Sequence, residues 1–219
     1  AKAKQAGRKP GGKPPKPPAP GIQSTDQINL TDEESRIMPV SGGGFEQAYN
    51  TQAAVNLDSL LVVAEAVTQA ANDKEQIVPM LEQLAALPKS LGKVDQLLAD
   101  TGFFSGKNVV ACEEAGIEPL IAVARDEHHA RWRERFTEPA PLSASATPAE
   151  RMAHRLRTKA GRAAYALRKQ TVEPVFGIIK SVLGFRQFLL RGLNKVGGEW
   201  RLVCLAWNLK RMAALRLQT

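Results

Sequence analysis

The sequence predicts an α/β fold that ends in a helical third. Three observations support this: two strand-like segments joined by a short turn, two short apolar runs that each follow a helical segment, and helical patterning over the C-terminal part. Strands that alternate with helices are typical of α/β domains. At 219 residues and 43% hydrophobic side chains, the chain can bury one core of ordinary size, which excludes global disorder.

The N-terminal segment is expected to remain extended. Residues 1–20 contain six prolines, three glycines and six basic side chains, with almost nothing to bury. We therefore interpret residues 1–27 as a flexible Pro/Lys-rich linker. From residue 28 the composition is that of a folded domain.

A β-hairpin is predicted next. Residues 45–55 follow the glycine run at 42–44 and read as a strand. Residues 60–68 read as its partner across a short turn at 56–59.

A helix and a buried strand follow the hairpin. Asn72 or Asp73 can cap the helix, and Pro88 ends it. Residues 94–100 then form a short apolar strand whose last residue is Asp100.

A second helix and strand complete this part of the fold. Ser105 can cap a helix that reaches about residue 115, and Gly116 suits its C-terminal end. Residues 118–124 are again apolar and strand-like.

The remainder of the chain is predicted to be a charged insertion followed by helices. Residues 125–148 are rich in charged residues, Pro, Ser and Ala and interrupt the α/β pattern. Helix is predicted from residue 149 to 183 with a break near Pro174, and again from about 199 to 215.

Charge is distributed very unevenly. The net charge is +6 over residues 1–20, −11 over 21–150 and +13 over 151–219, which gives the total of +8. A strongly basic C-terminal third is typical of proteins that bind a polyanion. Two cysteines provide neither a disulfide framework nor a zinc cluster, and no apolar run is long enough to cross a membrane.

Two acids stand out by their positions. Asp100 ends an apolar strand, where ligands bind in open α/β sheets, although it could equally be a turn or cap residue. Glu173 follows a helical stretch with seven basic residues and no acid, so it will be ionised and could bind a divalent metal. On a continuous helix, Lys169, Glu173 and Lys180 share one face, which is either a surface salt-bridge ladder or a functional face, and Arg168 points away.

Six stretches of the chain resemble insertion-sequence transposases of the DDE class. They are INLTDEESRIM at 28–38, GFEQAYNTQAAV at 44–55, LADTGFFS at 98–105, VEPVFGIIK at 172–180, FLLRGL at 188–193 and EWRLVCLAWNL at 199–209. The resemblance covers nearly all of residues 28–215. It implies a ribonuclease H-like fold, a mixed sheet flanked by helices, in which three acids bind two divalent metals for phosphoryl transfer on DNA.

Residue by residue, the resemblance assigns Asp100 as the second acid and Glu173 as the third, both catalytic and both metal ligands. Lys180 matches the family's lysine that contacts the transposon end. Tyr165 and Arg168 resemble the family's Tyr-x-x-Arg pair with one extra residue before Glu173, which leaves Arg168 and Lys169 as alternatives for that position. Together with the basic C-terminal third, the resemblance suggests a DNA-binding set of five cations: Lys169, Lys180, Arg168, Arg186 and Arg191.

The family's first aspartate has no counterpart here, because the family places it upstream of the Pro/Lys-rich linker. Asp32 resembles a downstream motif of the family instead. We therefore expect residues 28–215 to be a partial catalytic domain that lacks its first strand, with residues 125–148 inserted in it. The complete enzyme is expected to hold two Mg²⁺ or Mn²⁺ ions, since carboxylates from separate elements can bridge two metals.

The resulting hypothesis is DNA transposition by strand cleavage and strand transfer, with this chain as a C-terminal catalytic fragment that is inactive alone. A catalytically dead DNA-binding remnant and a metal-dependent nuclease on the same fold are the alternatives. The expected partners are DNA, as transposon ends and target, and further copies of the chain, but no membrane. The expected location is the bacterial cytoplasm, in association with the nucleoid.

Overall fold

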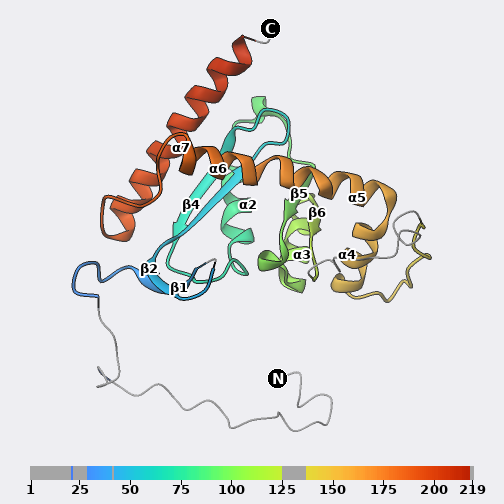
Figure 1. Ribbon diagram of the computed structural model, residues 1–219. Coiled ribbons are helices and arrows are strands. Elements are labelled where there is room, and N and C mark those ends of the chain that lie inside the picture. Colours follow the sequence, from blue (N-terminus) through green and yellow to red (C-terminus); the bar gives the residue numbers. More distant parts are fainter. Residues whose placement is uncertain (1–20, 22–28, 41, 125–136, 218–219) are drawn as a thin grey trace.

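The computed structural model describes residues 21, 29–40, 42–124 and 137–217 (Figure 1). The predicted linker, apart from Gly21, and residues 125–136 of the predicted insertion lie outside the described residues. Four consecutive strands are followed by helices that alternate with strands up to residue 121, and only helices come after them, so the α/β class is confirmed. None of the described helices is both long enough and apolar enough to cross a membrane.

The described strands pair as three separate two-stranded sheets. Antiparallel pairs are formed by β1 with β2 and by β3 with β4, whereas β5 and β6 are parallel. Among the described residues β3 and β5 each have one hydrogen-bonded neighbour and no strand joins them, so a continuous mixed sheet is not formed there. The sequence analysis predicts such a gap, because it predicts that the first strand is missing. The strands are β1 (Arg36–Pro39), β2 (Phe45–Ala48), β3 (Asn50–Val55), β4 (Val62–Thr68), β5 (Gln96–Ala99) and β6 (Glu118–Ile121).

The strand predicted over residues 45–55 is split at Tyr49, and its two halves belong to different sheets. The Tyr49 hydroxyl lies 2.8 Å from both carboxylate oxygens of Asp32 and donates to that group. Burial, and then the hydrogen bond to Asp32, raise the pKa of Tyr49 to about 12. This polar contact holds β2 beside the N-terminal segment while β3 continues into the hairpin with β4.

Helix α2 (Ile77–Ala85) carries the central apolar contacts of the α/β part. Its buried side chains pack against β4 through Ala64 and against β5 and β6 through Ala99 and Ile121. The helix begins four residues after Asp73, because the Asp73 carboxylate accepts hydrogen bonds from the side chains of Asn50 and Gln52 instead of capping it. The buried residues of α2 are Ile77, Met80, Leu81 and Leu84.

Helix α3 (Gly106–Glu114) begins and ends where the sequence predicts. The Ser105 hydroxyl accepts a hydrogen bond from the backbone N–H of Asn108, which satisfies one otherwise unpaired donor of the first turn. Gly116 follows the helix at φ +70°, a conformation that favours glycine.

The predicted long helix is broken at places other than Pro174. It consists of α4 (Pro148–Arg157), α5 (Lys159–Ala166), the 3₁₀ helix η3 (Leu167–Gln170) and α6 (Val172–Ser181). Pro174 lies in the first turn of α6, where the N–H that proline lacks has no partner within the helix. The breaks fall at Thr158 and Thr171 instead.

Helix α7 (Leu193–Arg216) closes the fold by lying across the β3–β4 hairpin (Figure 1). Trp200 donates its indole N–H to the Gln52 carbonyl at 3.1 Å, and Trp207 donates to the Leu60 carbonyl at 2.8 Å. The Asn208 side chain both accepts from and donates to the backbone of Val62. The tryptophans of the C-terminal helix thus form part of the hydrophobic core.

The N-terminus of α7 is held by acids from the start of the domain. Asp32 accepts the Gly192 N–H at 3.2 Å, and Glu34 accepts the Leu193 N–H at 2.8 Å. Carboxylates satisfy free N–H groups there and also suit the positive end of the helix dipole. In the structure, Asp32 is therefore a structural anchor.

Gly192 should resist substitution because of this anchor. Its φ is +83°, and an added Cβ would lie 2.9 Å from a Glu34 carboxylate oxygen. We expect Gly192→Ala to lower the free energy of unfolding by about 1 to 3 kcal/mol in urea denaturation. Gly198→Ala is the matched control, since its Cβ would meet nothing within 4 Å, and it should stabilise α7 slightly. Equal midpoints for the two variants would contradict the anchor.

Candidate functional site

Asp100 lies directly after β5 and is exposed. Its carboxylate accepts the backbone N–H of Gly102 at 2.8 Å and so caps the short 3₁₀ helix η2 (Thr101–Phe103). The side chain therefore combines a structural hydrogen bond with access to solvent at the carboxyl end of a strand.

A second carboxylate, that of Asp73, lies beside Asp100. A Cβ added to Gly102 would be 3.0 Å from Asp100 Oδ1 and 3.2 Å from Asp73 Oδ2. These two oxygens are therefore no farther apart than the sum of those distances, 6.2 Å. Gly102 fits because it has no side chain to fill the space between them.

The orientation of Asp73 is fixed by two amides. Asn50 and Gln52 each donate to Asp73 Oδ1 at 2.7 Å, and only 5% of Gln52 is exposed. Sequence reasoning missed this role because it considered Asp73 only as a helix cap. The available signal was the pair Asn50 and Gln52, two residues apart on one strand face, since buried amides require partners.

The described residues do not fit a two-metal centre. Among them, no three His, Cys, Asp or Glu side chains come together in a way that could hold a metal ion. Asp73 Oδ1 already accepts two amide N–H groups, which leaves its second oxygen beside Gly102. Asp100 and Asp73 alone are too few for a pair of bridged ions.

Glu173 lies in the first turn of α6 and pairs with Arg168, whose Nη2 is 3.3 Å from Glu173 Oε1. Glu173 is 57% exposed and Arg168 is 20% exposed. The Arg168 guanidinium also lies 5.7 Å from the ring centroid of Tyr165, and its buried Nε has no hydrogen-bond partner in the described part of the chain. Tyr165, Arg168 and Glu173 thus form one cluster on the α5–α6 junction.

This cluster corrects the predicted helix face. A continuous helix would have placed Lys169 beside Glu173 and turned Arg168 away. The 3₁₀ turn η3 and the break at Thr171 absorb the extra residue, so Arg168 is the cation that reaches Glu173 across five positions.

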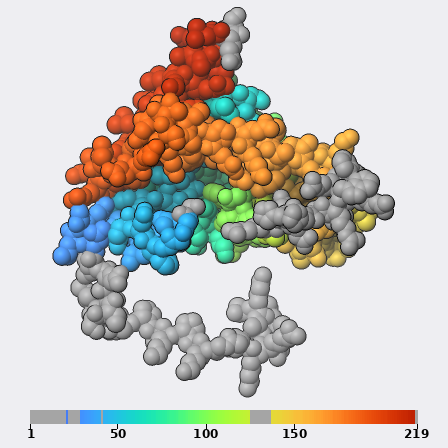
Figure 2. Space-filling view, viewed as in Figure 1, coloured from blue at the N-terminus to red at the C-terminus, as the bar shows by residue number. Residues whose placement is uncertain are grey.

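Two sets of basic side chains in the C-terminal third differ in their surroundings. Arg151 and Arg155 form ion pairs with Glu113, and Arg155 also pairs with Glu118, so these two arginines join α4 to α3 and β6. Helices α5 and α6 and the residues after them form a ridge on the face shown in Figure 2. A second set of four exposed basic residues belongs to η3, α6 and the segment that follows α6. It contains Lys169, Lys180, Arg186 and Arg191.

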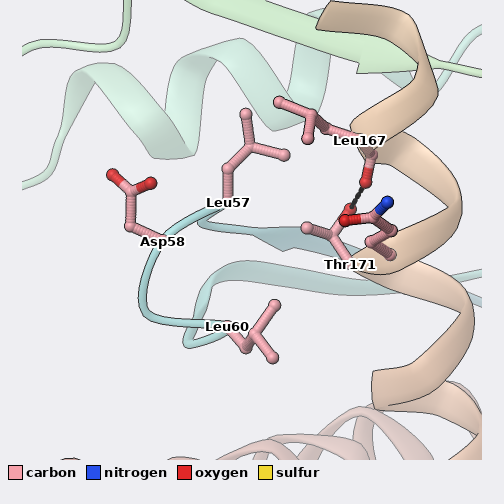
Figure 3. A pocket seen from close by; sticks show the side chains of 6 residues that line it. Leu57, Asp58, Leu60, Leu167 and Thr171 are labelled. Carbon is pink, nitrogen blue, oxygen red and sulfur yellow. Dashed lines mark hydrogen bonds between the residues drawn. The ribbon is translucent and has the colours of Figure 1, made fainter. Parts of the chain in front are cut away.

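A pocket lies between η3 and the turn that joins β3 to β4 (Figure 3). Thr171 faces it, and the Thr171 hydroxyl donates to the backbone carbonyls of Leu167 and Arg168. Neither Asp100 nor Glu173 lines the pocket, so it does not mark the predicted catalytic acids. Its lining residues are Leu57, Asp58, Leu60, Leu167, Gln170 and Thr171.

The two cysteines are not candidates for nucleophilic chemistry. Burial, with a smaller effect of a neighbouring glutamate, raises the pKa of Cys112 to about 11 and that of Cys204 to about 12. Both thiols are therefore protonated near neutral pH, and the thiolate is the reactive form.

Comparison with known proteins links the helical part of this chain to one family. Residues 133–213 match the family model described as a transposase DDE domain. The resemblance to DDE transposases of the insertion-sequence type is confirmed. The match includes the Tyr165, Arg168 and Glu173 cluster and most of α7, whereas Asp100 precedes the matched part of the chain. No curated protein matches the chain, and no solved structure matches it either.

Asp73 provides a test of the acidic pair at Gly102. Asp73→Ala leaves the donors of Asn50 and Gln52 without their shared acceptor, and we expect unfolding to become easier by about 1 to 3 kcal/mol. Asp73→Asn retains an acceptor oxygen, so its free energy of unfolding should fall much less than that of Asp73→Ala. Glu75→Ala, an exposed neighbour, is the control and should match the wild-type urea midpoint. A wild-type midpoint for Asp73→Ala would rule out this role.

Proposed function

We propose that this chain acts in DNA transposition as part of a DDE transposase that cleaves and joins DNA strands by metal-dependent phosphoryl transfer. The observation that carries the proposal is the transposase DDE match, which includes Glu173 on α6. The position of Asp100 after β5 adds support, because ligands bind at the carboxyl ends of strands in α/β folds.

In this proposal Asp100 and Glu173 are two of the catalytic acids. Mg²⁺ or Mn²⁺ held by such acids would stabilise both the attacking and the leaving oxygen. Since the described residues do not complete a two-metal site, further ligands would have to come from beyond them. Arg168 forms an ion pair with the Glu173 carboxylate, and the Tyr165 ring under Arg168 fixes the direction of the guanidinium.

We further propose that the complete domain is ribonuclease H-like and that one strand is to be added between β3 and β5. Two facts support this: each of those strands has a single hydrogen-bonded neighbour among the described residues, and α2 packs against both sheets. In the ribonuclease H-like order, the strand between these two is the one that bears the first aspartate.

The DNA-contacting surface in this proposal is the exposed group of Lys169, Lys180, Arg186 and Arg191. Lysine and arginine contacts to phosphates position a duplex without reading its sequence. Arg168 is proposed to act on Glu173 instead, since most of its side chain is covered.

DNA binding should be tolerant of sequence and sensitive to salt. The slope of log affinity against log salt concentration should become less steep when Lys169, Lys180, Arg186 and Arg191 are replaced by Gln. The change in slope should be up to about 3.6, because each lost phosphate contact reduces its magnitude by about 0.9. Fluorescence anisotropy with a labelled duplex measures the slope.

A control with the same change in net charge is available on the α/β part. Lys74, Lys89, Lys93 and Lys107 are also exposed, and changing all four to Gln should leave the slope nearly unchanged. If the control set flattened the slope as much as the C-terminal set of four, the binding surface would lie elsewhere.

The chain alone should not cleave DNA. We would incubate it with transposon-end DNA and Mn²⁺, with and without a segment from the upstream reading frame that carries an aspartate-bearing strand. Cleavage is expected only with the added segment and should be lost in Asp100→Asn and in Glu173→Gln. Cleavage by the chain alone that Asp100→Asn abolishes would show that all required acids lie within the 219 residues.

The same assay separates the alternatives. DNA binding without cleavage under either condition would indicate a catalytically dead DNA-binding remnant, which the incomplete acid set of the described residues would explain. Cleavage without joining of the product to a target would indicate a nuclease on the same fold.

A further inference from the structure

The segment that joins α6 to α7, residues 182–192, presents leucine side chains to solvent although its backbone is firmly held. Leu189 is 78% exposed and Leu190 is 48% exposed. The segment lies at one edge of the fold in Figure 1. An exposed leucine needs no explanation by itself, so its surroundings decide whether it has a role.

The backbone of Leu189 is fixed by a carboxylate of α7. Its N–H donates to both Glu199 oxygens, at 3.0 and 3.1 Å, and the Leu190 N–H donates to Glu199 Oε2 at 3.0 Å. Hydrogen bonds to a carboxylate are roughly twice as strong as those between neutral groups. Glu199 precedes Trp200, which is 2% exposed in the core, so these bonds tie the segment to the core.

Aromatic side chains before Leu189 pack inwards. The Phe188 ring packs edge to face against Phe185 and Tyr49, with centroids 5.4 and 6.2 Å apart. Phe185 in turn lies 6.3 Å from Trp200. With Phe188 packed inside and the next N–H bonded to α7, the Leu189 side chain is left directed away from the core.

The chain around Leu189 is basic. From residue 180 to 195 it contains no aspartate or glutamate and has four cations, all exposed: Lys180, Arg186, Arg191 and Lys195. Three carboxylates bond to this stretch, and each of them accepts backbone N–H groups between residues 189 and 193: Asp32, Glu34 and Glu199. Cations around an apolar side chain suit a polyanion with an apolar interior, which describes a nucleic-acid duplex.

We propose that Leu189 is a wedge that enters the minor groove of bound DNA and partly separates two stacked base pairs. Leucine is one of the apolar side chains that proteins insert between base steps, and the insertion kinks the duplex. Arg186 and Arg191 are three and two residues away, so their backbones lie within about 11 Å of Leu189, at about 3.6 Å per residue. Because a minor groove is about 6 Å wide, both arginines can reach phosphates beside it.

The inference rests on the proposed DNA-contacting surface and adds to it a residue that deforms the DNA. A wedge bends the duplex by roughly 20 to 90°, whereas each phosphate contact changes the salt dependence of binding. The bend therefore reports on Leu189, and the salt slope reports on the cations.

Energy transfer between dyes at the two ends of a duplex of about 20 base pairs tests the proposal, with a central TA step because such steps kink easily. The full wild-type chain at saturation should bring the ends closer and raise the energy transfer. Leu189→Ala should abolish most of this rise, while its salt slope stays that of the wild type. Its affinity should fall by no more than about tenfold, because the cost of unstacking is lost together with the apolar contact.

Three controls separate a wedge from a change in the fold. Leu189→Met keeps an apolar side chain at the same place and should retain the bend. Leu91→Ala removes a leucine that is 69% exposed outside the segment and should behave like the wild type. The melting temperatures of all variants should agree within a few degrees, because both leucines lie outside the core.

The outcomes distinguish the wedge from the proposed function. A wild-type chain that binds the duplex without bending it overturns the wedge, leaves the proposed function standing and assigns Leu189 to a protein partner. A Leu189→Ala variant that bends the duplex like the wild type also overturns the wedge. A chain that binds no duplex contradicts the proposed DNA-contacting surface and the wedge together.

Discussion

The packing of α7 onto the β3–β4 hairpin is the contact on which the rest of the structure depends. Two indole N–H groups and the Asn208 amide satisfy backbone groups of the hairpin, while Val175 and Ile179 of α6 fill the space beside them. A hairpin of two strands has little stability of its own, so it requires a covering element. The element comes from the far end of the sequence, and it positions α6, and with it Glu173, over the hairpin.

Local signals in the sequence predicted most helix ends and apolar faces. Ser105 and Gly116 bound α3 because capping and a positive φ depend on residues within one turn of each other. The buried positions of α2 follow from the helical period alone. Such features need no knowledge of distant partners, which explains why they could be predicted.

Features with distant partners were missed or misplaced. The split of the predicted strand at Tyr49 depends on its hydrogen bond to Asp32. The late start of α2 depends on the bonds from Asn50 and Gln52 to Asp73, which is more than twenty residues away from both. The expected mixed sheet is present only as separate strand pairs, because its continuity depends on strands that are far apart in the sequence. In the candidate site, the positions of Asp100 and Glu173 were predicted, but the partnership of Glu173 with Arg168 was not, since it depends on the 3₁₀ turn between them.

The anchoring of Gly192 by Asp32 also has a consequence for how the protein is made. These two residues are 160 positions apart, and ribosomes add roughly 5 to 20 residues each second. Asp32 and Glu34 are therefore synthesised roughly 8 to 32 s before the N-terminus of α7, which they bind. During that interval the β3–β4 hairpin lacks its cover and presents apolar side chains to the cell. Slow translation of the codons between Asp32 and Gly192 would lengthen this exposure. The need for chaperones should therefore depend on how fast the ribosome translates the middle of the mRNA.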